Sequence, residues 1–132
     1  KIGLVFVPEA LILAMRRARC VLIDATREAR LAFLVRDYAY LGDDVGALQD
    51  KLHRLREHQS RETLERWKSL AAAHALPELF AELIDQHYDP LYHRSQNHNY
   101  VNYGDALRVA SADLGEAGVR ELAARILAEG AG

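Results

Sequence analysis

The sequence predicts an α/β fold that is dominated by helices, with a small parallel sheet. Apolar, strand-like segments alternate with helical patterns at both ends of the chain, and residues 43–87 between them carry only helical periodicity. Alternation of this kind is typical of a layer in which helices connect parallel strands. We therefore expect three parts: an α/β part at 1–42, a three-helix insert at 43–87, and a loop with a closing strand and helix at 88–132.

The first part begins with an apolar segment, Ile2–Val7, that reads as a short buried strand. A buried parallel strand needs neighbours, so we expect upstream strands in the full protein or pairing with other copies of the chain. Pro8 suits the first turn of a helix, because its missing N–H group is not needed there. That helix is expected to end near Ala18.

A second strand is predicted over Cys20–Ala25, followed by a helix that Thr26 can cap. Gly42 is a suitable end for this helix. Its apolar residues recur at helical spacing: Leu31, Leu34, Val35, Tyr38 and Leu41.

The middle part predicts three amphipathic helices that pack as a small bundle. The first is capped by Asp43 or Asp44 and the second by Ser60, while Pro77 begins the third. His87 falls on an apolar helix face, where a hydrogen-bonded core histidine is the commoner case. His74 is placed on such a face in the same way.

The last part changes character at Tyr88. Residues 88–104 are rich in tyrosine, histidine and asparagine and follow no period, which predicts an extended loop or hairpin. A strand is expected over Ala106–Ala110. Asp113 and Glu116 resemble a capping box before the final helix, which Gly130 ends.

Composition limits the classes of function. The net charge is −2, which argues against nonspecific coating of nucleic acid. Residues 1–40 nevertheless carry seven Lys/Arg against four Asp/Glu. This excess leaves room for a local basic patch or, in the alternative, a solvated helix face. Its arginines are Arg16, Arg17, Arg19, Arg27, Arg30 and Arg36.

Cellular location is constrained only broadly. Cys20 is the single cysteine, so no internal disulfide can form and a reducing cytoplasm fits. The apolar run at Ile2–Val7 is too short to span a bilayer, and no signal peptide is visible. We expect a cytoplasmic protein without a membrane partner.

No complete catalytic motif is present. The lysines are Lys1, Lys51 and Lys68, and none follows a glycine as a phosphate-binding loop requires. The six histidines lack the spacing of a metal-ligand pair, so ordinary core or surface histidines are the preferred interpretation. We therefore predict no catalytic residue, cofactor or metal in this chain.

Two groups are candidates for binding. Arg27, Arg30 and Arg36 follow a predicted strand, where arginines in α/β layers can reach phosphates. The alternative for these arginines is surface pairing with Glu28 or Asp37.

The second group lies in the tyrosine-rich segment. Tyr88, Tyr92 and Arg94 are candidates for RNA contact, since bases stack on aromatic rings and arginine contacts phosphate. Asp89, with Pro90, is expected to shape a turn there. The alternative is a tyrosine-rich loop packed on the helices.

The segment Leu83-Ile84-Asp85-Gln86-His87-Tyr88-Asp89-Pro90-Leu91-Tyr92 resembles the Tyr-Asp-Pro-x-Tyr stretch near the end of tRNA 2-selenouridine synthases. Two other stretches occur in the same order as in that family. Ile2-Gly3 with Val7-Pro8 and Met15 is similar to its strand-Pro-helix step. Cys20–Ala25, then Arg30 and Asp37-Tyr38, is similar to its next strand and arginine helix. The resemblance covers roughly residues 1–100.

The resemblance implies a C-terminal part of a P-loop domain. Such enzymes join that domain to an N-terminal rhodanese domain and replace sulfur by selenium at the wobble 2-thiouridine of tRNA. Their substrates are selenophosphate and geranyl diphosphate, with a geranylated intermediate. Neither the rhodanese cysteine loop nor the Walker loop is in this sequence, and Cys20 does not match the rhodanese cysteine. The chain is thus expected to complete the fold, bind tRNA or the prenyl donor, need the missing N-terminal part, and be inactive alone.

Two alternative functions remain open at this point. The strand-helix frame and arginine helix also fit a fragment of a nucleotide or metabolite kinase. The helical insert also fits a non-enzymatic interaction module that buries its apolar faces against a partner.

Overall fold

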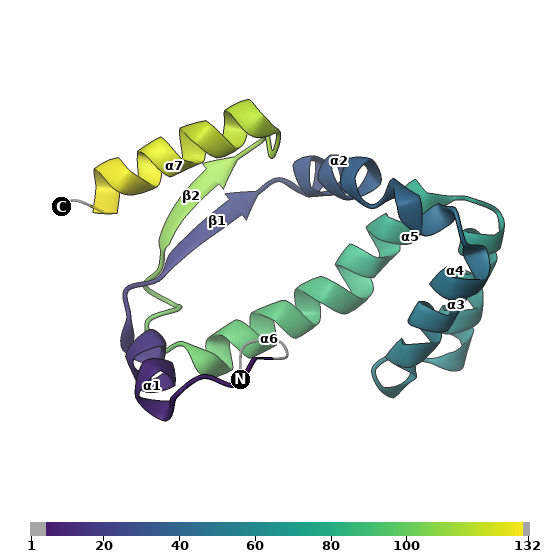
Figure 1. The fold of residues 1–132 in the computed structure, drawn as a ribbon, viewed down its shortest axis with the longest axis horizontal. Helices are drawn as coiled ribbons and strands as arrows, with labels where there is room; N and C mark the ends of the chain where they lie inside the picture. Colours follow the sequence, from purple (N-terminus) through teal and green to yellow (C-terminus); the bar gives the residue numbers. More distant parts are fainter. Residues whose placement is uncertain (1–4, 131–132) are drawn as a thin grey trace.

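A computed structural model describes residues 5–130 of the chain (Figure 1). Helices dominate it, and a small parallel sheet makes it an α/β structure, as predicted. In chain order the elements are α1 (Glu9–Arg17), β1 (Val21–Ala25), α2 (Arg27–Asp37), η1 (Ala39–Gly42), α3 (Val45–His53), η2 (Arg54–Glu57), α4 (Arg61–Ala72), α5 (Leu76–Leu83), η3 (Ile84–Tyr88), α6 (Asp89–Asn99), β2 (Leu107–Ser111) and α7 (Glu116–Gly130).

The sheet consists of β1 and β2 side by side. The two strands are parallel, with Val21 opposite Leu107 and Ala25 opposite Ser111, which confirms the predicted strand direction. Helix α7 returns along β2, where Val109 is fully buried (Figure 1). Each strand is thus followed by a helix, as expected of a parallel layer.

The strand predicted at Ile2–Val7 is only partly described. Ile2, Gly3 and Leu4 lie outside the described residues. Val5 and Phe6 are 63% and 84% exposed. The expected burial is therefore wrong for these two side chains in the structure of this chain.

Side-chain caps begin three of the helices, at positions that the sequence predicts. Thr26 Oγ1 accepts from the Ala29 amide at 3.1 Å, and Asp44 Oδ1 accepts from the Ala47 amide at 2.9 Å. Ser60 Oγ accepts from the Thr63 amide at 3.1 Å. Each bond satisfies one backbone donor that the first helical turn would otherwise leave free.

The main apolar core lies among α3, α4 and α5. Trp67 is fully buried in it, and its indole nitrogen donates to Glu82 at 3.0 Å. Helix α2 packs on the same core through half-buried leucine and valine side chains. The buried residues of this core are Leu48, Leu52, Leu64, Trp67, Ala71, Leu79, Phe80 and Leu83. The division of the chain at residues 42 and 87 stays a prediction, because α2 shares this core.

The loop expected over residues 88–104 is wrong for 88–99, which are helical, whereas residues 100–104 form turns as expected. Residues 89–99 form α6, which continues α5 through the π-helical turn η3 into one long helix (Figure 1). Helix α6 buries none of its residues, so it has no apolar stripe that periodicity could detect. It forms because α5 already supplies the costly first turn of the helix.

The C-terminal turn also differs from expectation. Asp113 Oδ1 accepts from the Gly115 amide at 2.7 Å, within the turn that precedes α7. The residue before Glu116 is Gly115, so Asp113 does not occupy the first position of the predicted capping box.

Among the described residues, no helix is long and apolar enough to cross a membrane.

Candidate functional site

The site is built on the long helix, whose path is set by Pro90. A proline inside a helix cannot donate to the carbonyl four residues earlier and collides with it. Here the preceding turn widens, and the Asp89 amide donates to Ile84 O, five residues back. The Gln86 carbonyl, to which Pro90 cannot donate, accepts from the Gln59 side chain at 3.1 Å. Asp89 and Pro90 therefore lie within a helix, and the turn predicted at these residues is wrong.

Two of the three predicted phosphate-binding arginines hold this helix against α2. Arg27 donates to both oxygens of Asp85, the closest contact being 2.7 Å. Arg30 donates to both oxygens of Asp89 at 2.8 Å. The hydrogen bond from Arg27 lowers the pKa of Asp85 and, in return, raises the pKa of Arg27. Each guanidinium thus already has an anionic partner within the chain.

Arg36 is also paired. It donates to Asp37 at 2.5 Å and lies over the Phe33 ring, 5.5 Å from the ring centre. Its hydrogen bond lowers the pKa of Asp37. Arg36 borders a cavity of about 210 Å³ between α2 and the turn after β2, at the carboxyl ends of the strands. Phosphate binding by these three arginines stays a prediction, and it would have to compete with a carboxylate at each one.

The predicted RNA-contact residues divide between two faces of the long helix. Tyr88 and Tyr92 are four residues apart and 57% and 53% exposed, so they follow one another along one face. Arg94 is exposed but two residues beyond Tyr92, which turns it roughly 200° away around α6. The tyrosines therefore form one surface, and Arg94 belongs to another.

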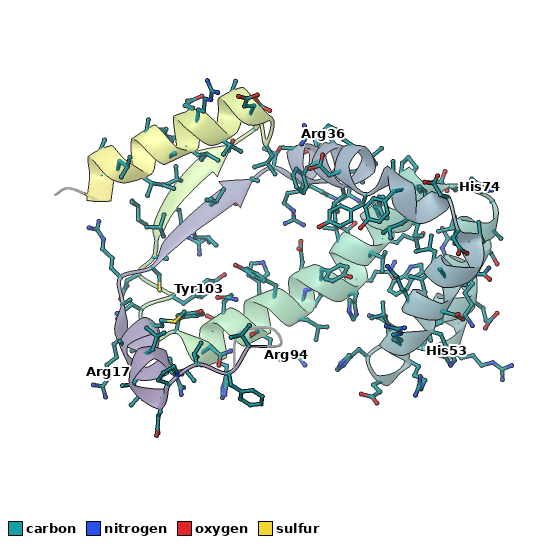
Figure 2. The ribbon with its side chains drawn as sticks, in the orientation of Figure 1. Arg17, Arg36, His53, His74, Arg94 and Tyr103 are labelled. Atoms are coloured by element: carbon teal, nitrogen blue, oxygen red, sulfur yellow. The ribbon has the colours of Figure 1, made fainter. Side chains whose placement is uncertain are left out.

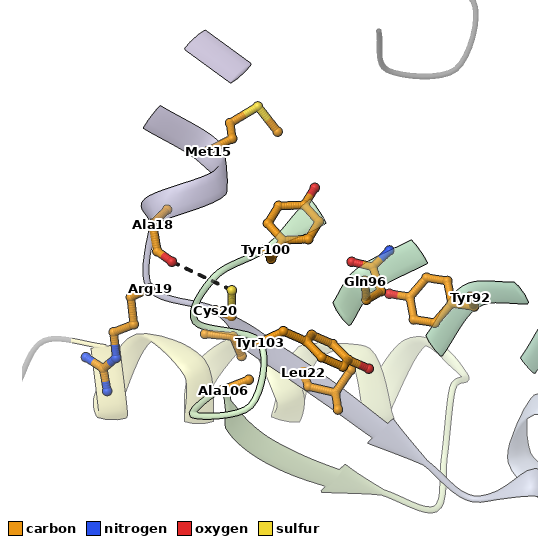
Figure 3. Close-up of a pocket in the computed structure, with 11 residues that line it drawn as sticks. Met15, Ala18, Arg19, Cys20, Leu22, Tyr92, Gln96, Tyr100, Tyr103 and Ala106 are labelled. Carbon is orange, nitrogen blue, oxygen red and sulfur yellow. Dashed lines mark hydrogen bonds between the residues drawn. The ribbon is translucent and has the colours of Figure 1, made fainter. Parts of the chain in front are cut away.

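A cavity of about 320 Å³ begins beside Tyr92. Figure 3 shows Tyr100 and Tyr103 between Cys20, which precedes β1, and Gln96 with Tyr92 on α6. Tyr103 is buried, and its hydroxyl group lies 3.3 Å from His93 Nδ1. The remaining lining residues are Met15, Ala18, Arg19, Val21, Leu22 and Ala106.

The end of α1 forms the rim of this cavity. The Val101 amide donates to Arg16 O at 3.0 Å, and Asn102 donates to Arg17 O at 2.8 Å. Figure 2 shows Arg17 and Tyr103 at this end of the molecule, with Arg36 away on α2. A backbone bond from Val101 and a side-chain bond from Asn102 therefore fix the arginine-bearing end of α1 beside the tyrosines.

The arginines at this end differ from those on α2. Arg16, Arg17 and Arg19 are exposed, and among residues 5–130 none of the three has a carboxylate partner. Arg16 Nε donates to the Asn99 carbonyl at 3.2 Å. The three side chains can thus meet an external anion without first breaking an ion pair.

We call the surface formed by Arg16, Arg17, Arg19, Tyr92 and Tyr100 the arginine–tyrosine surface. The sequence indicates a basic patch at these arginines and places Tyr100 in a tyrosine-rich segment. Their proximity arises from contacts between residues more than 80 positions apart, which no sequence spacing predicts. In the described part of the chain, no group of three His, Cys, Asp or Glu side chains is placed to hold a metal ion.

Comparison with known proteins gives no match: no family model, no curated protein and no solved structure matches this chain.

Proposed function

We propose that this chain is the C-terminal portion of a tRNA-modifying transferase of the 2-selenouridine synthase type. In it, selenium from selenophosphate replaces sulfur at the wobble 2-thiouridine of tRNA, in the cytoplasm. The chain completes an α/β domain and contributes tRNA binding, while the catalytic groups lie elsewhere in the protein. The observation that carries the RNA-binding part is the arginine–tyrosine surface.

The chemistry of this surface suits a single-stranded segment of RNA. Exposed aromatic rings stack with unpaired bases, and guanidinium groups bond two phosphate oxygens at once. The described structure supplies both: Tyr92 of this surface has an exposed ring, with Tyr88 one helical turn before it, and Arg17 and Arg19 have no carboxylate partners. A local patch is sufficient, so the net charge of −2 for the whole chain does not oppose it.

The fold is compatible with the same proposal. Two parallel strands, each followed by a helix, are what a portion of a P-loop-type layer would contain. The apolar side chains of Val21 and Ile23 are exposed on β1. In a larger parallel sheet such side chains are normally covered by further elements.

Activity of the full-length protein is the direct test. Purified protein is incubated with geranyl diphosphate, selenophosphate and a tRNA that carries wobble 2-thiouridine, and the tRNA is then digested to nucleosides that are identified by mass spectrometry. We expect 2-selenouridine to appear at the expense of 2-thiouridine. ATP binding without tRNA affinity or selenium transfer would instead support a kinase and reject the proposal.

A further inference from the structure

We infer that the cavity beside Tyr92 binds a single unstacked nucleobase of the RNA, with the adjoining phosphates on Arg17 and Arg19. This inference rests on the proposed RNA-binding function and adds a base-specific pocket to it. The cavity, at about 320 Å³, is close to the lower end of the roughly 300–1,000 Å³ range of ligand sites. A single ring system fits that volume better than two stacked bases.

The lining matches a base in its chemistry. Tyr92 and Tyr100 offer ring faces for stacking, and Met15 and Leu22 close the apolar part of the wall. Gln96 brings one amide group, which can donate to and accept from the edge of a base at the same time. Single-stranded RNA is read by this combination of aromatic stacking and edge hydrogen bonds.

The cavity wall is held in place before any ligand arrives. The Leu107 amide donates to Cys20 O at 3.0 Å, which fixes the segment after Tyr103 to the start of β1. His93 lies within hydrogen-bonding distance of the Tyr103 hydroxyl group and so positions that ring. A wall with these internal bonds loses little freedom when a base enters, which favours binding.

The positive charges at the rim suit the phosphates of a nucleotide. Arg19 lines the cavity. Arg17 stands two residues earlier in the chain, at the end of α1. Neither has a carboxylate partner among residues 5–130. The Arg19 side chain extends from the rim on the side away from Tyr100 and Tyr103 (Figure 3), so it would meet a phosphate that flanks the bound base and lies outside the cavity, which suits charge complementarity.

The test compares two hexamers on the full-length protein: hexauridylate, and a ribose-phosphate hexamer of equal charge that lacks bases. Affinities are measured by fluorescence anisotropy. We expect the hexamer with bases to bind about tenfold more tightly. Tyr92→Ala and Gln96→Leu should each reduce this ratio toward one, while Tyr40→Ala, an exposed tyrosine outside the cavity, should preserve it.

Arg17→Ala separates the two proposals, because it should weaken both hexamers by the same factor and keep their ratio. Equal affinity for the two hexamers, or a ratio that Tyr92→Ala and Gln96→Leu leave unchanged, would overturn the base pocket while tRNA binding still stood. Loss of prenyl diphosphate binding in those variants, with the ratio intact, would also overturn it. Absence of any RNA binding would reject the proposed function as well.

Discussion

Arg30 and Asp89, 59 residues apart, are joined by two hydrogen bonds of 2.8 Å between one guanidinium nitrogen and both carboxylate oxygens. This half-exposed pair fixes α2 against the start of α6. We expect Arg30→Ala to lower the free energy of unfolding by about 1 kcal/mol, because surface ion pairs contribute that much at most. Urea denaturation of the full-length protein measures it.

A double-mutant cycle isolates the pair from other effects of the substitution. Arg30→Ala combined with Asp89→Ala should cost less than the sum of the two single changes. Arg36→Ala is the matched control, since the carboxylate that Arg36 pairs with in the described structure is that of its neighbour Asp37 on the same helix. Additive losses in the cycle would show that the pair does not hold the two helices together.

Gly118 is required where α7 approaches the turn after β2. A β-carbon at this position would lie 2.1 Å from the carbonyl oxygen of Asp113. Gly118→Ala should therefore destabilise the protein by about 1–3 kcal/mol, despite the better helix propensity of alanine. Gly130→Ala is the control, as it meets open space in the same helix. Equal thermal stability of the two variants would contradict this contact.

His74 follows the end of α4 and adopts the left-handed region, with φ of 55°. Its amide donates to Ala71 O and the Ala75 amide donates to Leu70 O, the pattern of a Schellman motif. Glycine adopts this conformation without steric cost, so His74→Gly should raise the free energy of unfolding by about 1 kcal/mol. His74→Ala should give no such gain. A glycine variant that melts below the parent protein would disprove the interpretation.

The pH dependence of stability should reflect His87. The ring is buried, and Gln59 Nε2 lies 3.2 Å from its Nδ1. Burial, and to a lesser degree the charge of His58, lowers the pKa of His87 below its ordinary value of 6.5. As the pH falls, the unfolded chain therefore binds a proton at this histidine before the folded chain does. The contribution of neutral His87 to the free energy of unfolding is fully present above about pH 6.5 and is lost as the pH falls below that value.

Unfolding titrations between pH 7 and pH 5 measure this loss. In His87→Gln the decline over that window should be shallower, while His53→Gln, which replaces an exposed histidine, should keep the parent slope. The same slope in His87→Gln and the parent would remove His87 as the cause.

Much of the fold was predictable because local signals agreed with the final packing. Thr26, Asp44 and Ser60 cap the helices that they were expected to cap, and β1 and β2 are parallel. His87 is a buried, hydrogen-bonded histidine, as its apolar face suggested. These features depend on spacing within one or two helical turns.

The errors have a common physical cause. The periodicity predicts His74 on an apolar helix face, but the helix ends before it and the side chain is exposed. The residues after Tyr88 were expected to form a loop, because a helix without buried residues has no hydrophobic period. In each case the structure depends on where a helix ends or continues, which composition does not encode.

The candidate site was predictable only in its residue types. The arginines and tyrosines stand out in the sequence, but their pairing depends on contacts across the chain. Arg27 and Arg30 were expected to bind phosphate and are bound by Asp85 and Asp89. Arg17 and Arg19 are left without carboxylates within residues 5–130. No spacing rule could have distinguished the two groups.

The most direct test of the central claim is tRNA affinity as a function of salt concentration, measured on the full-length protein. Replacing Arg17 and Arg19 by alanine should weaken binding and reduce the slope of log affinity against log salt by about 1–2. Replacing Arg54 and Arg56, two exposed arginines on η2, removes the same charge and should leave the slope unchanged. An identical slope and affinity in the parent protein and the Arg17/Arg19 variant would contradict the claim that the arginine–tyrosine surface binds tRNA.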